Sequence, residues 1–190
     1  FDASDIQYLP VFLPYTGVTS QPGKGTYCLY HGNLSISENE EAAIWLLQNI
    51  FTDLEIPFVI AGKNPSQKLE FLAHEHAHTC LVANPTDKEL QDMIAKAQIN
   101  ILPSFNNTGV KLKLLNALYN GRHCIVNKAG VEGSGLESLC TITNEITATK
   151  NAIIELYDTA FVENKKRQTL LNQLYNNDLN AKKIIDYFWG

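Results

Sequence analysis

Six short apolar runs alternate along this chain with longer segments of helical period, and this alternation restricts the fold more than any other feature. The runs are rich in β-branched and aromatic residues and lie at 26–31, 57–62, 79–84, 99–104, 123–128 and, more weakly, 139–143. Strands that are apolar throughout are buried on both faces, as in a parallel sheet covered by helices. With right-handed crossovers, the pattern predicts a doubly wound, Rossmann-like α/β fold with six parallel strands.

Helical segments are expected between and after these runs. They lie at 38–51, 67–75, 87–97, 109–120, 146–157 and 163–187, and the last is expected to break near Asn176-Asn177. Ser37 and Glu40 have the spacing of a capping box, and Thr86 begins a shorter acidic helix start. The pair Asn120-Gly121 is a typical helix stop.

The first 25 residues differ from the rest of the chain. They contain three of its seven prolines and three of its eleven glycines. Because proline at this density disfavours helices and sheet interiors, we predict a proline-rich arm or interdomain linker over residues 1–25. One α/β domain with C-terminal helices follows over residues 26–190.

Composition and charge exclude several classes of protein. A chain of 190 residues with 45% hydrophobic residues can bury a core without metals or disulfides. With a net charge of −5, the chain lacks the excess of basic residues that is typical of a nucleic-acid-binding protein. Its apolar stretches are too short to span a bilayer. The four cysteines lie far apart without a C-x-x-C pair, so we expect reduced thiols and a cytoplasmic location.

A ligand site is expected where the strand order reverses. In a doubly wound sheet of order 3-2-1-4-5-6, ligands bind beyond the carboxyl ends of strands 1 and 4. The loops at 31–35 and 103–109 face that crevice, and both are polar loops of small residues that lead into helices. Their backbone N–H groups can point at an anion. His31 ends the first strand there, as either a functional or a structural histidine.

The helix expected at 109–120 has one narrow polar stripe. Thr108 is its expected N-cap, and at 100° per residue the stripe contains Gly109, Lys113, Asn116 and Asn120 on an otherwise largely apolar helix. Lysine is unfavourable near the positive end of a helix dipole unless an anion binds there. The stripe therefore either lines a phosphate site, with Gly109 allowing close approach, or reaches solvent with its lysine snorkelling.

These residues also carry a resemblance to a known family. The run PSFNNTGVKLKLLNALYNGRHCIV, followed by KAGVEGSGL, resembles the C-terminal, donor-binding domain of retaining glycosyltransferases of the GT-B fold. TYCLYHGNLSISENEEA and IPFVIAGKNPS look like its first two strand–loop units. The resemblance covers about residues 26–160 and is greatest to the group that contains sucrose, glycogen and mannosyl transferases. It implies a hexosyltransferase that uses a nucleotide-diphosphate sugar and needs no metal or other cofactor.

The resemblance implies which residues hold the donor. In the family, the loop after the first strand and the start of the fourth helix hold the diphosphate, which assigns roles to Gly32 and Asn33 here. Two glutamates eight residues apart hold the sugar and the ribose, and their positions are occupied by Thr108 and Asn116. The loop that contains Glu132 approaches the donor sugar.

The chain departs from the family pattern in its charged residues. Both glutamates are replaced, and the arginine and lysine that usually follow the first-strand glycine are absent. Lys63, Lys111 and Lys113 are the candidates to replace this positive charge. Asn116 can still form a hydrogen bond with a ribose hydroxyl, although a neutral amide binds more weakly than a carboxylate.

The resemblance also implies partners. GT-B enzymes form their active site between two domains and hold the acceptor on the N-terminal one. We therefore expect a donor-binding half that does not turn over alone, with a nucleotide-diphosphate sugar and a missing N-terminal domain as partners. The replaced residues keep open an alternative, a non-catalytic binding or interaction domain derived from the same fold. An unrelated Rossmann-like regulatory domain is a third hypothesis.

Three other motifs carry less weight. His74, His76 and His78 alternate and would share a face on a strand, but they lack the partners typical of a zinc site, so a helix-end turn is expected. The glycines at 130–135 do not follow the strand–GxGxxG–helix order of a dinucleotide site. The basic run at 165–167 is expected to be a solvated helix face.

Overall fold

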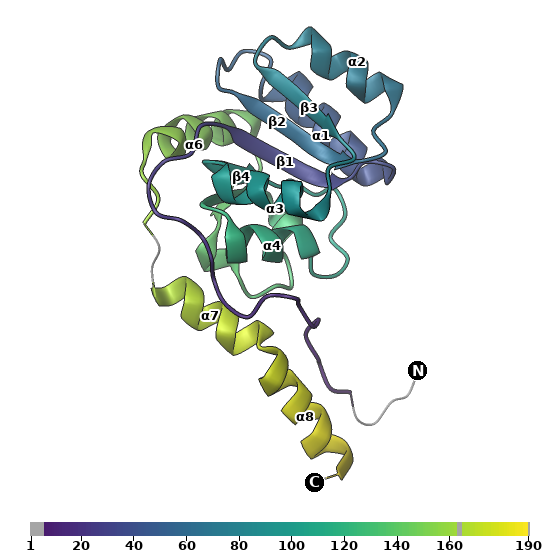
Figure 1. Cartoon of the computed structure of the whole chain (residues 1–190), viewed down its shortest axis with the longest axis vertical. Coiled ribbons are helices and arrows are strands. Elements are labelled where there is room, and N and C mark those ends of the chain that lie inside the picture. The colour runs from purple at the N-terminus through teal and green to yellow at the C-terminus, as the bar shows by residue number, and fades with distance from the viewer. Residues whose placement is uncertain (1–5, 163–164, 190) are drawn as a thin grey trace.

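A six-stranded parallel sheet forms the centre of the molecule (Figure 1). The computed structural model describes residues 6–162 and 165–189. The strands are β1 (Cys28–Asn33), β2 (Phe58–Lys63), β3 (Thr79–Ala83), β4 (Ile99–Ile101), β5 (His123–Val126) and β6 (Thr141–Ile142). They pair in the order β3-β2-β1-β4-β5-β6, and each of these pairings is parallel. The predicted fold class and strand order are confirmed.

Helices cover both faces of the sheet. They are α1 (Ser37–Asn49), α2 (Gln67–Glu75), α3 (Asp87–Lys96), α4 (Leu112–Asn120), α5 (Lys128–Val131), α6 (Ile146–Asp158), α7 (Lys165–Tyr175) and α8 (Asn177–Trp189), with a short 3₁₀ turn at Glu137–Leu139. Figure 1 shows α7 and α8 extending away from the α/β body. The break at Asn176 is confirmed, whereas the expected helix start at 163–164 lies outside the described residues. Within the described ranges, no helix has the length and apolarity that a membrane crossing requires.

Residues on β1 alternate between two apolar clusters. Leu29 is fully buried and packs with Ile94 of α3. Its neighbour Tyr30 belongs to the larger cluster, which includes Leu46 and Leu47 of α1. Burial on both faces explains why the strand is apolar throughout rather than alternating with polar residues.

The N-terminal arm runs outside the sheet without helix or strand of its own along its described part, residues 6–25. Its backbone is fixed to the domain at separate points. The Leu13 N–H donates to Asn177 Oδ1 (3.0 Å), and the Thr19 N–H donates to the Tyr119 carbonyl (2.7 Å). At Gly25, a Cβ atom would lie 2.4 Å from the backbone that precedes β4, so only glycine fits.

The helix that was expected from Gly109 begins three residues later, and the prediction of Thr108 as its N-cap is wrong. Lys111 occupies the N-cap position of α4 with extended backbone, and Gly109 has a positive φ of 69°, which is not helical. The N–H and hydroxyl groups of Thr108 both bond to Asn106 Oδ1, at 2.8 and 2.6 Å. This local turn competes with capping for the same groups.

The capping box predicted at Ser37 and Glu40 is also wrong. The N-cap of α1 is Ile36, without a side-chain cap, and the Glu40 carboxylate instead accepts a hydrogen bond from the Ser66 hydroxyl. A tertiary contact has therefore replaced the local one. By contrast, Thr86 and Glu89 form a full capping box at the start of α3.

The basic run at 165–167 is only partly solvated, as Arg167 is 5% exposed. Its guanidinium donates to the carbonyls of Leu118 (3.4 Å), Gly121 (2.9 Å) and Arg122 (2.8 Å). Carbonyls at a helix C-terminus lack intrahelical partners and carry partial negative charge. Arg167 therefore fixes α7 to the end of α4, while Lys166 is exposed as predicted.

Replacing Arg167 is expected to destabilise the fold. Arg167→Ala removes charge-assisted hydrogen bonds to buried carbonyls and should lower the free energy of unfolding by about 2–3 kcal/mol. Urea unfolding followed by circular dichroism measures this change. The neighbouring Lys166→Ala variant should stay within about 0.5 kcal/mol of the wild type. Equal stability of the two variants would contradict the docking role of Arg167.

Candidate functional site

The strand order reverses at the carboxyl edge of the sheet, between β1 and β4. Doubly wound proteins bind ligands at this position, and we call it the crevice. β1 pairs with β2 along its whole length, from Cys28 to Asn33, but with β4 only at Cys28 and Leu29. The last residues of β1 therefore extend past the pairing with β4. Because α1 and α4 leave these two strands from opposite faces, their first turns border the opening.

Lys113 of α4 reaches into this crevice and is held there by neutral groups. Its Nζ lies 3.2 Å from the Tyr30 hydroxyl and 3.1 Å from Asn39 Oδ1. It also lies over the Tyr30 ring, 4.8 Å from the ring centre. The salt bridges of the described chain include no acidic partner for Lys113. Burial, with a smaller effect of the Lys111 charge, lowers the pKa of Lys113 to about 8.

His31 is buried beside this ammonium group. The side chain is 3% exposed, and its Nε2 atom has no hydrogen-bond partner among the residues described. Burial first, and then the positive charge of Lys113, lowers the pKa of His31 to about 3. The imidazole is therefore neutral at physiological pH. A buried polar atom without a partner is uncommon in folded proteins, and this one is a candidate to bond a ligand.

Asn39, in the first turn of α1, joins the two sides of the crevice. Its Nδ2 donates to the Asn33 carbonyl (3.0 Å), while its Oδ1 accepts from Lys113. A Cβ atom at Gly32 would lie 3.3 Å from the Asn39 side chain, so the loop approaches closely. The structure thus brings together Gly32, Asn33 and Lys113, as the sequence predicted. Asn39 and Tyr30 were not predicted from the sequence, where only their positions close to the first-strand loop distinguish them.

Three other predicted residues lie at the end of β2 and in the loop before α4. Lys63 is the last residue of β2. It is paired with Asn33 of β1, and its side chain is exposed. Thr108 and Gly109 lie in the exposed loop before α4. A Cβ atom at Gly109 would meet nothing within 4 Å, so its positive φ, rather than crowding, explains the glycine.

The two remaining predicted residues are further from Lys113 in the hydrogen-bond network. Asn116 lies about one turn later on α4, and its backbone and side-chain oxygens accept from Asn120 Nδ2 at 3.2 and 2.8 Å. Glu132 is exposed at the C-cap of α5. In the described chain, no hydrogen bond or ion pair joins Glu132 to the crevice cluster.

The loop after β4 is held in place by Asn127. Its Oδ1 accepts from the N–H groups of Ser104 (2.9 Å) and Gly130 (3.0 Å), and its Nδ2 donates to the Ser104 carbonyl (2.7 Å). No sequence pattern predicts this role of Asn127. Because the loop leads into α4, Asn127 helps to define the wall of the crevice.

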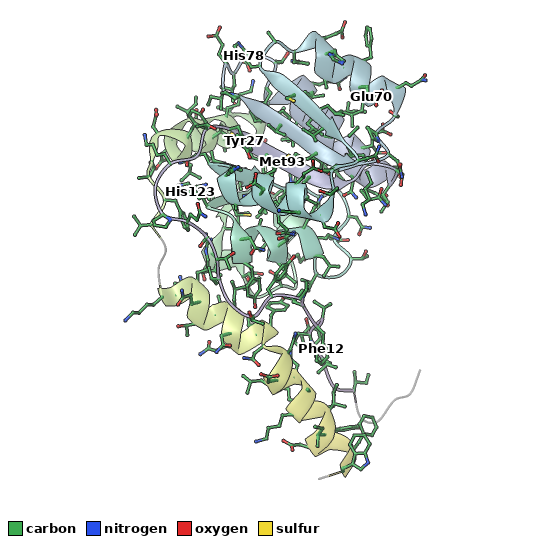
Figure 2. The ribbon with its side chains drawn as sticks, in the orientation of Figure 1. Phe12, Tyr27, Glu70, His78, Met93 and His123 are labelled. Atoms are coloured by element: carbon green, nitrogen blue, oxygen red, sulfur yellow. The ribbon has the colours of Figure 1, made fainter. Side chains whose placement is uncertain are left out.

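The histidine motif lies away from this site. α2 ends at Glu75 and His76 is its C-cap, so the segment is the predicted helix-end turn rather than a strand. Figure 2 shows His78 near the start of β3 and well apart from Glu70. No group of three or more histidine, cysteine or acidic side chains suited to a metal occurs in the described ranges.

Comparison of the sequence with known protein families identifies the class to which this chain belongs. Residues 25–159 match the family model of the glycosyl transferases group 1. The match covers more than half of the chain, and the chain therefore belongs to this glycosyltransferase family.

One curated relative is an uncharacterized 44.6 kDa protein in the cps region of Klebsiella pneumoniae. It is 29% identical over 138 residues, which make up 66% of this chain and 36% of the relative. The chain thus spans about a third of that protein.

Solved glycosyltransferase structures share the fold. TarM of S. aureus has a TM-score of 0.73 and 12% identity, covering 100% of this chain and 41% of TarM. AviGT4, a glycosyltransferase involved in avilamycin A biosynthesis, has a TM-score of 0.69 and 14% identity, covering 97% and 58%. A trehalose-phosphate synthase from Burkholderia xenovorans has a TM-score of 0.65 and 10% identity, covering 86% and 43%. Identities this low show a common fold only.

The position of Lys113 predicts a pH dependence of stability. Its pKa of about 8 in the fold is below the value of about 10.4 expected in the unfolded chain. Between these values the unfolded state binds more protons, so wild-type stability should rise with pH relative to Lys113→Met. Urea unfolding of both proteins at about pH 7 and about pH 9.5 measures the difference. A difference that does not change with pH would contradict the lowered pKa.

Proposed function

We propose that the crevice binds the diphosphate of a nucleotide sugar, and that this chain is the donor-binding part of a hexosyltransferase. The observation that carries the proposal is the environment of Lys113, a half-buried ammonium group whose hydrogen-bond partners among the described residues are neutral. Burying a cation without a counter-ion is unfavourable. A diphosphate in the crevice would supply the missing negative charge.

The surrounding groups suit the same ligand. Lys111 lies two residues before Lys113, and its Nζ donates to the Thr108 carbonyl at 2.7 Å. The neutral His31 ring can donate from Nε2 in one tautomer, and a phosphate oxygen would satisfy this buried atom. Positive charge held in place before the reaction would stabilise the diphosphate as it leaves the sugar.

Structural neighbours support a nucleoside diphosphate as the ligand class. The TarM structure was determined in complex with UDP, and the Burkholderia synthase is described as UDP-forming. This chain is similar to both in fold. The proposal that this chain binds a ligand of the same class rests on the groups around Lys113.

An acceptor-binding domain is proposed to complete the active site. The arm and α8 together expose large apolar side chains, among them Ile6 (80% exposed), Tyr8 (69%), Phe188 (66%) and Trp189 (78%). A groove of about 620 Å³ lies between these two segments. Contiguous exposed apolar surface is typical of an interface, and we assign it to a second domain of the same protein.

The free state of all four thiols supports a cytoplasmic location.

A second function, a non-catalytic binding domain, is favoured by one observation. Thr108 and Asn116 stand where the family resemblance implies glutamates, and both are engaged locally, with Asn106 and Asn120 respectively. Neither offers a carboxylate to the sugar or the ribose. Release of nucleoside diphosphate from nucleotide sugars by the complete two-domain protein distinguishes the two functions, because a binding domain releases none.

Removal of the Lys113 charge should weaken ligand binding. A charge-assisted contact is worth about 1.5–3 kcal/mol, so Lys113→Ala should weaken binding of nucleoside diphosphates by about ten- to a hundredfold. Calorimetry with UDP, ADP and GDP at low and high salt measures this loss, which should shrink as salt screens the charge. Lys88→Ala, on the exposed side of α3, is the matched control. Equal affinities of wild type and Lys113→Ala would refute the phosphate site.

Asn116 should contribute to recognition of the ribose only. Asn116→Ala should weaken UDP binding by less than about tenfold, because one neutral hydrogen bond is worth about 1 kcal/mol. Binding of inorganic pyrophosphate, which has no ribose, should not change. Competition calorimetry with the two ligands makes the comparison. Equal losses for UDP and pyrophosphate would place Asn116 at the phosphates instead.

A further inference from the structure

A groove of about 710 Å³ lies outside the crevice and runs between the arm and α7. Residues 15–18 form one wall, the polar side of α7 forms the other, and Tyr119 of α4 lies between them. None of the predicted donor-binding residues lines it. In Figure 2, Phe12 marks the place where the arm passes the junction of α7 and α8.

The wall formed by the arm is held in place at both ends. Asn177 bonds Leu13 twice, to its N–H (3.0 Å) and to its carbonyl (2.6 Å). The Thr19 N–H donates to the Tyr119 carbonyl (2.7 Å). Between these points, the ring of Tyr15 packs against Tyr119, with centres 5.1 Å apart. The groove is therefore preformed, which lowers the entropic cost of binding a ligand.

The other wall presents neutral hydrogen-bonding groups. Arg167, Leu171 and Tyr175 form the buried row of α7. The next two rows, at i,i+4 spacing, are polar and exposed, with Gln168 and Asn172 in one and Thr169 and Gln173 in the other. Each amide carries donors and an acceptor, and in Asn172 the Oδ1 atom already accepts one hydrogen bond from Asn176 Nδ2 (2.6 Å).

The charges along the groove restrict the ligand. Among the described residues that line it there is no lysine, arginine or histidine, and Asp178 is the one acidic side chain. An anionic ligand would find no counter-charge in this lining. An apolar ligand would leave the row of amides without partners, which is costly on burial.

We propose that this groove binds a neutral oligosaccharide. Sugar hydroxyls both donate and accept, as the amide and hydroxyl groups of α7 do, and the apolar faces of sugar rings suit the tyrosine side of the groove. The volume lies in the range of about 300–1,000 Å³ that is typical of small-ligand sites. This site is separate from the nucleotide crevice and does not depend on the function proposed for it.

Side-chain amide signals in NMR spectra test the proposal directly. Maltotriose, mannotriose and triacetylchitotriose are each titrated into the ¹⁵N-labelled 190-residue chain. At least one should shift the amide signals of Gln168 and Gln173 in a saturable way, and the Asn39 signal in the crevice should not move. Gln168→Ala/Asn172→Ala should weaken this binding by about tenfold or more, because two hydrogen bonds are lost.

Two controls locate the binding. Gln48→Ala, an exposed amide on α1, should leave the sugar affinity unchanged. Lys113→Ala should leave it unchanged as well, even though that variant tests the nucleotide site. The proposal is overturned if none of the three sugars shifts the α7 amides, if the shifts are confined to the crevice, or if the double variant binds as well as the wild type.

Discussion

Parallel pairing of β1 with β2 on one side and β4 on the other is the constraint on which the site depends. Crossovers on opposite faces carry the chain away from β1 and β4, so their carboxyl ends are left with an opening between them. Close pairing of β1 and β2 has its own requirement, since a Cβ atom at Gly62 would lie 2.0 Å from the Gly32 carbonyl oxygen. Glycine at 62 therefore allows the Gly32 loop to reach the crevice edge in register.

Two cations, the buried Arg167 and the half-buried Lys113, differ in how well the fold satisfies their charge. Arg167 is surrounded by backbone carbonyls at the end of α4, and these oxygens satisfy its planar donors. Lys113 has a hydroxyl, one amide oxygen and an aromatic ring. Its lowered pKa reflects a charge that the fold alone stabilises poorly. Such unfavourable placement is typical of sites that bind a ligand of opposite charge.

The crevice and the groove along α7 differ in the chemistry of their polar groups. The crevice gathers lysines and a neutral histidine at the edge of a rigid sheet, where backbone groups can join in binding an anion. The groove along α7 offers amides and tyrosines without basic residues. The two ligands proposed above match these surfaces, because a diphosphate is charged and an oligosaccharide offers uncharged hydroxyl groups.

Periodicity determined the fold class and the strand order, because strand burial and right-handed crossovers are general properties of such chains. Loop composition indicated the region of the candidate site. Lys113, Gly32 and Asn33 could be placed at one edge on this basis. The start of α4, the burial of Arg167 and the bridging role of Asn39 could not. Each depends on partners distant in sequence or on competing local turns, such as the Asn106 turn that occupies Thr108. Only the tertiary structure decides which of several possible partners a polar group reaches, because hydrogen bonds depend on distances of a few tenths of an ångström that no sequence pattern specifies.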